Sequence, residues 1–281
     1  MKTGFDDLDS IMQINKGELI VVASRPAMGK STLALNILSN VAIKEKKTVL
    51  MFNLESSKEN IINKLIISNS MVEADKFEIY DKYQKGKIIK PELTDDDWDR
   101  IFYGLNILKD APIFIDTTAP YTIDDICKKS RELKQKENIE LIIIDYLQLI
   151  QFDKSEALSR DNETREILKE LNILAKELNI PVIVTSQLSR KVEERSDKRP
   201  IIADFSNTSS SILTYSNKIL FLYRDSYYNK SKKSNITDII IAKNENGKIR
   251  YNKIRLDARI LYVWKYYCFG VRIEILKKYI V

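Results

Sequence analysis

Residues 18–35 read ELIVVASRPAMGKSTLAL, and this stretch decides the fold. Residues 18–24 form a short apolar run with several β-branched side chains, which is typical of a buried strand. Residues 31–44 carry apolar side chains at helical spacing. The loop between the two segments ends in Gly29-Lys30-Ser31. The sequence therefore predicts a strand, a tight loop and a helix in direct succession.

A loop of this kind, ending in Gly-Lys-Ser at the start of a helix, is typical of the phosphate-binding loop of a nucleotide-binding protein. Gly29 lets the backbone approach the phosphates, Lys30 reaches the β- and γ-phosphates, and the Ser31 hydroxyl is the expected Mg²⁺ ligand. The usual first glycine is replaced by Ser24. The alternative is a chance Gly-Lys-Ser at a helix start, against which the flanking strand argues. The residues expected to bind the nucleotide are Ser24, Arg25, Pro26, Ala27, Met28, Gly29, Lys30, Ser31 and Thr32.

The rest of the chain alternates short β-branched runs with segments of helical periodicity. This alternation predicts an α/β fold, with a mostly parallel central sheet and helices on both faces. Thr94 with Asp97 and Thr122 with Asp125 predict two capped helix N-termini. Further strands are expected at residues 48–53, 113–116, 141–145, 182–187, 219–223 and 239–243, and further helices at residues 58–68, 95–108, 123–136 and 163–178.

Polar residues end three of the predicted strands, where an α/β sheet places its functional groups. Asp145 follows a continuously apolar run and is either a second Mg²⁺ ligand or a turn-forming aspartate; the presence of Lys30 favours the metal role. Glu55 is either the base that activates water or an acid that favours the dipole of the next helix. Gln187 is a candidate sensor of the γ-phosphate.

The composition excludes several kinds of chemistry. The chain has no histidine, so it has no Ser-His-Asp triad and no imidazole metal ligand. Cys127 and Cys268 lie far apart without a C-x-x-C companion, so neither a disulfide framework nor a zinc site is expected. No apolar run approaches the ~20 residues that a bilayer requires, and no signal peptide opens the chain. We therefore expect a soluble, intracellular protein without membrane contact.

Positive charge gathers toward the C-terminus. The whole chain carries a net charge of +6, of which residues 226–281 contribute +9 and the preceding residues −3. A basic surface suits nucleic acid, although solvated lysines give the same count. The basic, aromatic tail at residues 260–281 either stacks on bases or packs its rings on the core, and its composition favours packing.

Several of these motifs together resemble the C-terminal, RecA-like motor domain of DnaB-type replicative DNA helicases. The resemblance runs in order from about residue 3 to about residue 256. It implies a RecA-like P-loop NTPase core at residues 1–259, followed by a divergent tail at residues 260–281. The matching runs are Thr3-Gly4-Phe5, Leu8-Asp9, Arg25-Pro26-Ala27-Met28-Gly29-Lys30-Ser31, Leu54-Glu55, Ile144-Asp145-Tyr146-Leu147-Gln148-Leu149, Ser186-Gln187-Leu188-Ser189-Arg190, Asp197-Lys198-Arg199-Pro200 and Phe221-Leu222-Tyr223-Arg224-Asp225.

The resemblance also implies a function. Such motors hydrolyse ATP and unwind DNA in the 5′-to-3′ direction during replication, and the resemblance favours Glu55 as their general base. They form homohexameric rings with ATP at the subunit interfaces and single-stranded DNA in the central channel. A primase or a helicase loader is a further expected partner. The expected location is the bacterial cytoplasm, or the plastid stroma if the gene lies in that organelle.

In such rings a neighbouring subunit completes the ATP site with a lysine and an arginine finger. Lys243 matches the lysine and is expected to act catalytically in trans. The arginine position is Glu245, whose carboxylate would repel a triphosphate. Because such fingers contribute about 10³–10⁵ in rate, this is a large departure. Lys248 and Arg250 are nearby cations that could replace the missing one.

Two further departures bear on activity. Between Asp204 and Asn217, where the family contacts DNA phosphates, the chain offers hydroxyl and amide groups but no cation. The helical N-terminal collar domain of such helicases is also expected to be absent, since the chain begins at the motor. These departures favour an alternative, a catalytically weakened nucleotide- and DNA-binding remnant or regulatory subunit. A recombination or clock-type ATPase on the same fold is disfavoured by the Asp145-Tyr146-Leu147-Gln148-Leu149 run.

Overall fold

The computed structural model describes residues 1–72, 82–84, 87–89, 93–118, 121–152, 159–229, 236–245 and 254–257. The strands are β1 (Leu19–Ser24), β2 (Val49–Asn53), β3 (Lys82–Gln84), β4 (Lys87–Ile89), β5 (Ile113–Asp116), β6 (Leu141–Asp145), β7 (Val182–Gln187), β8 (Lys218–Tyr223), β9 (Ile236–Asn244) and β10 (Ile254–Asp257). The helices are α1 (Asp6–Asp9), α2 (Lys30–Lys44), α3 (Lys58–Ser70), α5 (Asp95–Lys109), α6 (Ile123–Glu137), α7 (Arg160–Leu178), α8 (Ser209–Tyr215) and α9 (Asp225–Tyr228), with 3₁₀ turns η1 (Leu147–Leu149), η2 (Arg190–Glu194) and η3 (Ile202–Thr208).

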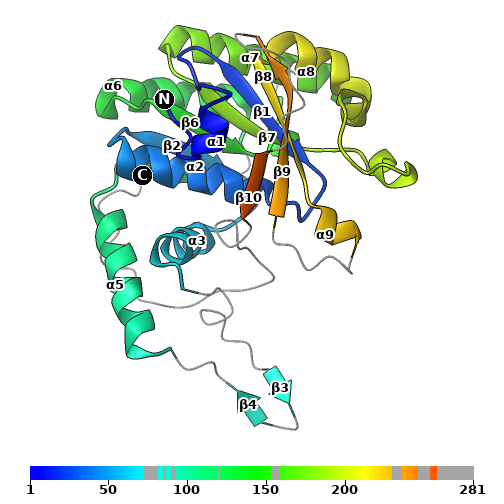
Figure 1. Ribbon diagram of the computed structural model, residues 1–281. Helices are drawn as coiled ribbons and strands as arrows, with labels where there is room; N and C mark the ends of the chain where they lie inside the picture. The colour runs from blue at the N-terminus through cyan, green and yellow to red at the C-terminus, as the bar shows by residue number, and fades with distance from the viewer. Residues whose placement is uncertain are drawn as a thin grey trace.

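Eight of the described strands form one mixed sheet in the order β10-β9-β8-β1-β7-β6-β2-β5 (Figure 1). The six strands from β8 to β5 run parallel to one another. β9 runs antiparallel to β8, and β10 runs antiparallel to β9. The parallel strands bring their carboxyl ends to one edge of the sheet, which confirms the predicted α/β fold.

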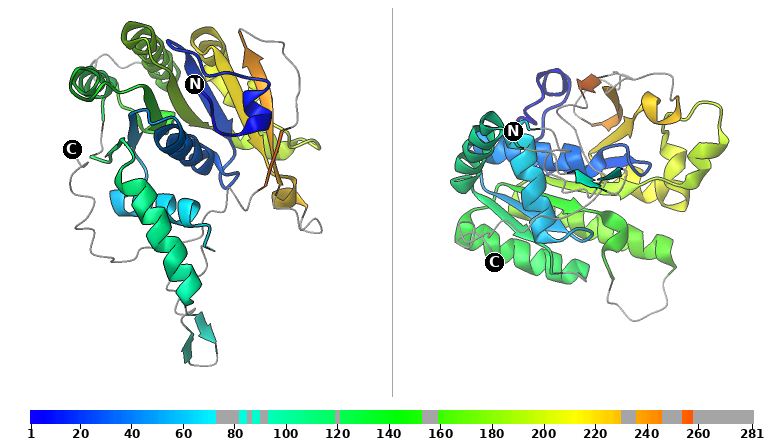
Figure 2. Two further views of the ribbon diagram at one scale, coloured as in Figure 1. Left: turned by 60° about the vertical axis from the view of Figure 1, so that its left-hand side comes forward. Right: turned by 90° about the horizontal axis from the view of Figure 1, so that it is seen from below.

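Helices cover both faces of this sheet, as Figure 2 shows from two further directions. Alternate residues of each strand face opposite layers, because side chains along a strand point to alternate sides. Val22 belongs to the apolar cluster that contains the buried side chains of α2 and α3. Val21 belongs to the cluster that contains α6 and α7. The central strands are therefore covered on both sides, as their continuous apolar character predicts.

α5 packs on α3 rather than directly under the sheet. A Cβ atom added at Gly104 of α5 would lie 3.0 Å from the backbone nitrogen of Ser70, so the close approach of the two helices requires glycine. The outer face of α5 leaves Trp98, Phe102 and Tyr103 largely exposed.

All seven strands and five helices predicted from the sequence are present, with ends shifted by at most three residues. Both predicted capping boxes, at Thr94 and Thr122, are confirmed. α7 begins three residues earlier than predicted, because the Ser159 side chain accepts a hydrogen bond from the Asn162 backbone and caps it. Elements without a prediction are α1, the β3–β4 pair, α8, α9 and β10.

Some predictions fall on residues that the structure does not describe. Lys248, Arg250, Cys268 and the tail at residues 260–281 lie outside the described residues. None of the described helices is both long enough and apolar enough to cross a membrane.

Candidate nucleotide-binding site

The loop between β1 and α2 presents an open helix N-terminus. Gly29 is the residue that precedes α2, and its φ of +93° lies in the left-handed region that favours glycine. No atom lies within 4 Å of a Cβ built at Gly29, and no side chain caps the helix at this residue. Since no side chain caps them, the first backbone N–H groups of α2 are left for a ligand, and they carry the partial positive charge of a helix N-terminus, which suits a phosphate.

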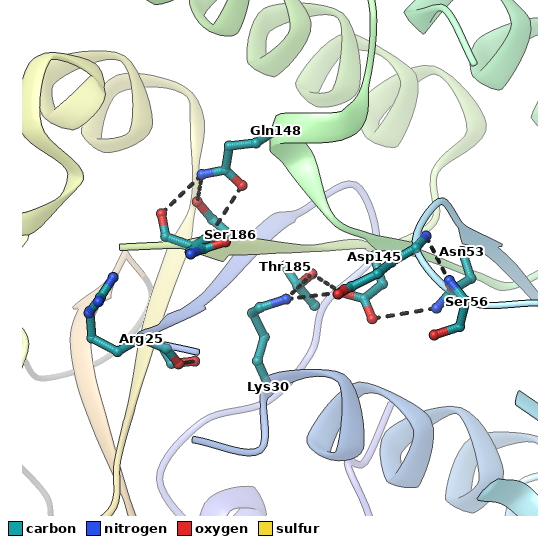
Figure 3. Close-up of polar contacts among 11 residues, drawn as sticks. Arg25, Lys30, Asn53, Ser56, Asp145, Gln148, Thr185 and Ser186 are labelled. Carbon is teal, nitrogen blue, oxygen red and sulfur yellow. Dashed lines mark hydrogen bonds and ion pairs between the residues drawn. The ribbon is translucent and has the colours of Figure 1, made fainter. Parts of the chain in front are cut away.

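Lys30, Asp145 and Thr185 meet beside this loop (Figure 3). The Lys30 Nζ donates to Asp145 Oδ1 at 3.1 Å and to Thr185 Oγ1 at 3.3 Å, and the Thr185 hydroxyl donates to the same carboxylate oxygen at 2.5 Å. Burial raises the pKa of Asp145, but the Lys30 charge and hydrogen bonds from Thr185 and Ser31 outweigh it and leave the pKa below its ordinary value. The buried carboxylate is therefore ionised.

The donor atoms at this point fit Mg²⁺. The Ser31 hydroxyl is hydrogen-bonded to the Asp145 carboxylate, so the two predicted metal ligands are adjacent. Hydroxyl and carboxylate oxygens are hard ligands of the kind that Mg²⁺ takes together with phosphate and water oxygens. No group of three or more acidic, cysteine or histidine side chains that could hold a metal occurs among the described residues. A metal here would therefore complete its shell with phosphate and water.

Glu55 lies on the turn that follows β2, beside the end of β6. Asn53 is paired with Asp145 across the two strands. Its side-chain Oδ1 accepts from the backbone N–H of Glu55 at 3.2 Å and of Ser56 at 2.7 Å, while its Nδ2 lies 3.5 Å from Asp145 Oδ2. One asparagine thus fixes the exposed Glu55 on the same sheet edge as the candidate metal ligands.

Two residues without a predicted role add to the electrostatics of this site. Burial lowers the pKa of Lys64 on α3, whereas the negative charges of Asp145 and Glu55 act in the opposite direction. Lys64 is therefore a second cation close to the site. The ring of Tyr146 lies under the Lys30 ammonium, 4.8 Å from it, in a cation–π contact.

Gln187 ends β7 next to Ser24 of the loop, and its side chain is exposed. Gln148 holds its backbone: Gln148 Oε1 accepts from the Gln187 N–H at 3.2 Å, and Nε2 donates to the Gln187 carbonyl and the Ser186 hydroxyl at 3.0 Å each (Figure 3). Sequence reasoning gave no role to Gln148 or Thr185. One feature of the sequence could have pointed to Thr185: it begins the run of polar residues that ends an otherwise apolar strand.

The predicted loop residues divide into two groups. Gly29, Lys30 and Ser31 surround the open helix N-terminus. The Arg25 side chain instead lies apart from Lys30, pairing with Glu193 Oε1 at 2.9 Å and donating to the Leu188 carbonyl at 3.0 Å (Figure 3). Of the other candidates, Ser24, Met28 and Thr32 have buried side chains, and Pro26 and Ala27 are exposed.

Lys243 does not lie with the other candidates. Because β9 runs antiparallel to β8, Lys243 pairs with Ile219, at the end of the sheet opposite the loop. Its ammonium donates to the carbonyls of Leu213 and Ser216, at 2.7 and 2.6 Å, and to Glu245 Oε1 at 2.7 Å. It thereby caps the C-terminus of α8. An action on the loop of its own subunit is excluded by this position.

Glu245, at the expected arginine position, is built into the same corner. Its carboxylate accepts from Lys243 and from Asn217 Nδ2, the latter at 2.7 Å. The hydrogen bond from Lys243 is the main reason that the pKa of Glu245 lies below its ordinary value. The lysine and the acid therefore neutralise each other within one subunit.

The segment between Asp204 and Asn217 forms η3 and α8, and its hydroxyls mostly serve its own backbone. Thr208 donates to the Phe205 carbonyl at 2.9 Å, and Ser209 donates to the Ser206 carbonyl at 2.6 Å. Ser206 itself has a φ of 57° and a ψ of −130°, a conformation that only glycine adopts without strain.

The comparisons with known proteins agree on one family. The family model for the DnaB-like helicase C-terminal domain matches residues 1–262. The replicative DNA helicase DnaB of Geobacillus stearothermophilus is 41% identical over 249 residues, covering 88% of this chain and 52% of that protein. The probable replicative DNA helicase of Trieres chinensis is 37% identical over 264 residues, covering 92% of this chain and 55% of that protein. The chain thus spans about half the length of these relatives.

Solved structures show the same likeness. A structure described as an ATPase domain has a TM-score of 0.82 and 30% sequence identity, covering 93% of this chain and 89% of that chain. A DnaB-like replicative helicase, described with its interactions with primase, has a TM-score of 0.81 and 31% identity, covering 90% of this chain and 58% of that chain.

Proposed function

Because the chain belongs to the DnaB-like helicase C-terminal domain family, we propose that it is an ATP-hydrolysing helicase motor that unwinds DNA in the 5′-to-3′ direction during replication. The observation that carries the proposal is the buried Asp145 carboxylate, which Lys30, Thr185 and Ser31 contact beside the N-terminus of α2. This arrangement supplies a phosphate cradle, a cation and a metal ligand in one place.

The residues of the site have complementary roles in this proposal. Gly29 and the first N–H groups of α2 receive the phosphates, and Lys30 neutralises their charge. Ser31 and Asp145 would hold Mg²⁺, which when bound neutralises charge that develops on the phosphate oxygens. Glu55, fixed by Asn53, orients a water molecule for in-line attack on the γ-phosphorus and accepts its proton, while the bond to the β–γ bridging oxygen breaks.

The remaining elements of the proposal concern assembly. Residues 1–259 form the motor domain, six copies form a ring, and single-stranded DNA occupies its channel. Lys243 reaches the ATP of a neighbouring subunit, since its own loop lies at the other end of the sheet. For this the ammonium must exchange the Leu213 and Ser216 carbonyls and Glu245 for phosphate oxygens. A primase, of the kind that accompanies the structural relative, is the proposed partner outside the ring.

The second candidate function is a weakened motor that binds nucleotide and turns over slowly. The Lys243–Glu245 pair favours it, because the glutamate neutralises the lysine that would act on the ATP of a neighbour. A missing finger of this kind lowers the rate by about 10³–10⁵.

Steady-state ATP hydrolysis by the full chain, with and without single-stranded DNA, tests the proposal against this alternative. Lys30→Ala serves as the inactive control and Glu245→Arg as the restored finger. DNA-stimulated turnover that is lost in Lys30→Ala supports the motor. Nucleotide binding without turnover in the natural chain, with turnover gained in Glu245→Arg, would show the weakened form instead.

A further inference from the structure

A group of three tyrosines lies where β8 ends and α9 follows: Tyr223 ends β8, and Tyr227 and Tyr228 belong to α9. Tyr223 and Tyr228 are stacked, with ring centroids 5.9 Å apart and planes at 16°. Tyr227 meets the Tyr228 ring edge-on at 5.1 Å and 82°. Tyr223 is buried, whereas 50% of Tyr227 is exposed. The group therefore presents one accessible aromatic ring on a rigid base.

This tyrosine group is tied to the start of the phosphate loop. The Tyr228 hydroxyl donates to Glu193 Oε1 at 3.1 Å, and Glu193 is paired with Arg25 Nε at 2.9 Å. On the other side, the Arg199 guanidinium lies 5.3 Å from the centre of the Tyr223 ring. These contacts connect the Tyr223 and Tyr228 rings, on which Tyr227 packs, to Arg25 of the loop.

The order of the strands places this ring at the nucleoside end of a bound triphosphate. Asp145 ends β6 and Glu55 follows β2, and both strands lie on one side of β1. α9 follows β8, which lies on the other side of β1 with Leu222 next to Ser24. A triphosphate with its γ end at Asp145 and Glu55 therefore directs its nucleoside toward β8 and α9.

We propose that Tyr227 is the stacking platform for the base of the bound nucleoside triphosphate. The inference rests on the proposed nucleotide binding and goes beyond it by assigning the base a place. Every base has a π-face, so a stacking platform tolerates different bases. The site therefore binds adenine and guanine nucleotides with similar affinity, and loss of the ring affects both alike.

Calorimetric titration of the full chain with ADP, GDP and inorganic tripolyphosphate tests this assignment. Tyr227→Ala is expected to weaken ADP and GDP about tenfold, because an aromatic platform contributes that order of affinity per base. Tripolyphosphate, which has no base, keeps its affinity. Tyr227→Trp is expected to bind the two nucleotides and tripolyphosphate with the affinity of the natural chain. Tyr103→Ala removes a tyrosine on α5 that is 66% exposed, and it changes neither kind of binding, while Lys30→Ala weakens all three ligands.

The outcomes separate the two proposals. Unchanged ADP affinity in Tyr227→Ala, or an equal loss for ADP and tripolyphosphate, overturns the platform and leaves the nucleotide site intact. No binding of ADP by the natural chain, or equal binding by Lys30→Ala, overturns the proposed function itself. If tripolyphosphate binds too weakly to measure, the contrast between Tyr227→Ala and Tyr227→Trp decides.

Discussion

Thr185 connects the two charged groups of the candidate site. Its hydroxyl donates to Asp145 and accepts from Lys30, so it holds the lysine and the carboxylate in one geometry. The sequence identified Lys30, Ser31 and Asp145 from their motifs, and the structure places all three together. The sequence alone could not identify Thr185, because only the pairing of β6 with β7 brings its hydroxyl to the Asp145 carboxylate. Strand pairing is a property of the whole sheet and not of either segment.

Thr185→Val is expected to lower the turnover of ATP about tenfold without loss of the fold. Valine has nearly the shape of threonine but lacks the hydroxyl, and a hydrogen bond to a charged group contributes ~1.5–3 kcal/mol. Steady-state hydrolysis without DNA measures the effect. Thr214→Val is the matched control, since that hydroxyl is exposed and donates to the Ser210 carbonyl within α8. Unchanged turnover in Thr185→Val would contradict the role.

Ser206→Gly is expected to stabilise the protein by about 1 kcal/mol. Serine is strained at a φ of 57° and a ψ of −130°, and release of such strain outweighs the extra chain entropy of glycine. Chemical denaturation measures the free energy of unfolding. Ser210→Gly, inside α8, should instead destabilise by about the same amount. A loss of stability in both variants would mean that Ser206 is not strained.

Among the helices and strands, the sequence predicted those features that depend only on residues close together in the chain. The capping residues at Thr94 and Thr122 start α5 and α6 as expected, because each cap is complete within four residues. α8, β10 and the β3–β4 pair were not predicted. α8 is short, and its C-terminus is completed by Lys243 of β9, which lies 28 residues beyond the end of α8 at Tyr215. A partner so far away in the chain leaves no pattern of apolar residues in the short helix that it completes.

Lys218 is a further case of a long-range partner. The strand predicted from the sequence begins one residue later, at Ile219. In the structure Lys218 is buried at the start of β8 and forms an ion pair with the buried Glu18, which precedes β1. Burial raises the pKa of Glu18, but hydrogen bonds from Lys218 and Asn15 outweigh it and lower the pKa overall.

Lys218→Met is expected to lower the free energy of unfolding by ~3–5 kcal/mol, because it leaves the buried Glu18 carboxylate without this cation. The double variant Glu18→Gln/Lys218→Met should recover most of the loss. Arg131→Met, which breaks an exposed pair with Glu177, should cost about 1 kcal/mol or less. Chemical denaturation near neutral pH measures all three. No recovery in the double variant would show that Lys218 acts through packing rather than charge.

The same pair predicts a pH dependence. Since the folded pKa of Glu18 is lowered, its contribution to stability is present above the ordinary glutamate value of 4.5 and is lost as the pH falls through the lowered value. Denaturation curves measured between pH 7 and pH 3 should therefore lose stability less steeply in Glu18→Gln than in the natural chain. An equally steep loss in Glu18→Gln would mean that other carboxylates account for it.

For the whole molecule, the opposite positions of the phosphate loop and Lys243 predict complementation between subunits. Lys30→Ala and Lys243→Met should each be nearly inactive in ATP hydrolysis. An equal mixture should regain about a quarter of the natural turnover, because random assembly pairs an intact loop with an intact neighbouring lysine at that frequency. As a control, the double variant Lys30→Ala/Lys243→Met replaces one of the two single variants in the mixture. This mixture should regain no ATP hydrolysis. Full turnover by Lys243→Met alone would contradict the trans role.

The corner formed by Glu245, Lys243 and Asn217 also bears on how the sequence can change over generations. An arginine at position 245 would remove the acceptor of the Asn217 amide and the counter-ion of Lys243 in one step. Both contacts are exposed to solvent, and Lys243 keeps the Leu213 and Ser216 carbonyls as acceptors, so their loss costs about 1 kcal/mol or less. The single substitution Glu245→Arg is therefore expected to be tolerated by the fold. Replacement of the arginine by this glutamate is therefore a reversible step in the history of such a sequence.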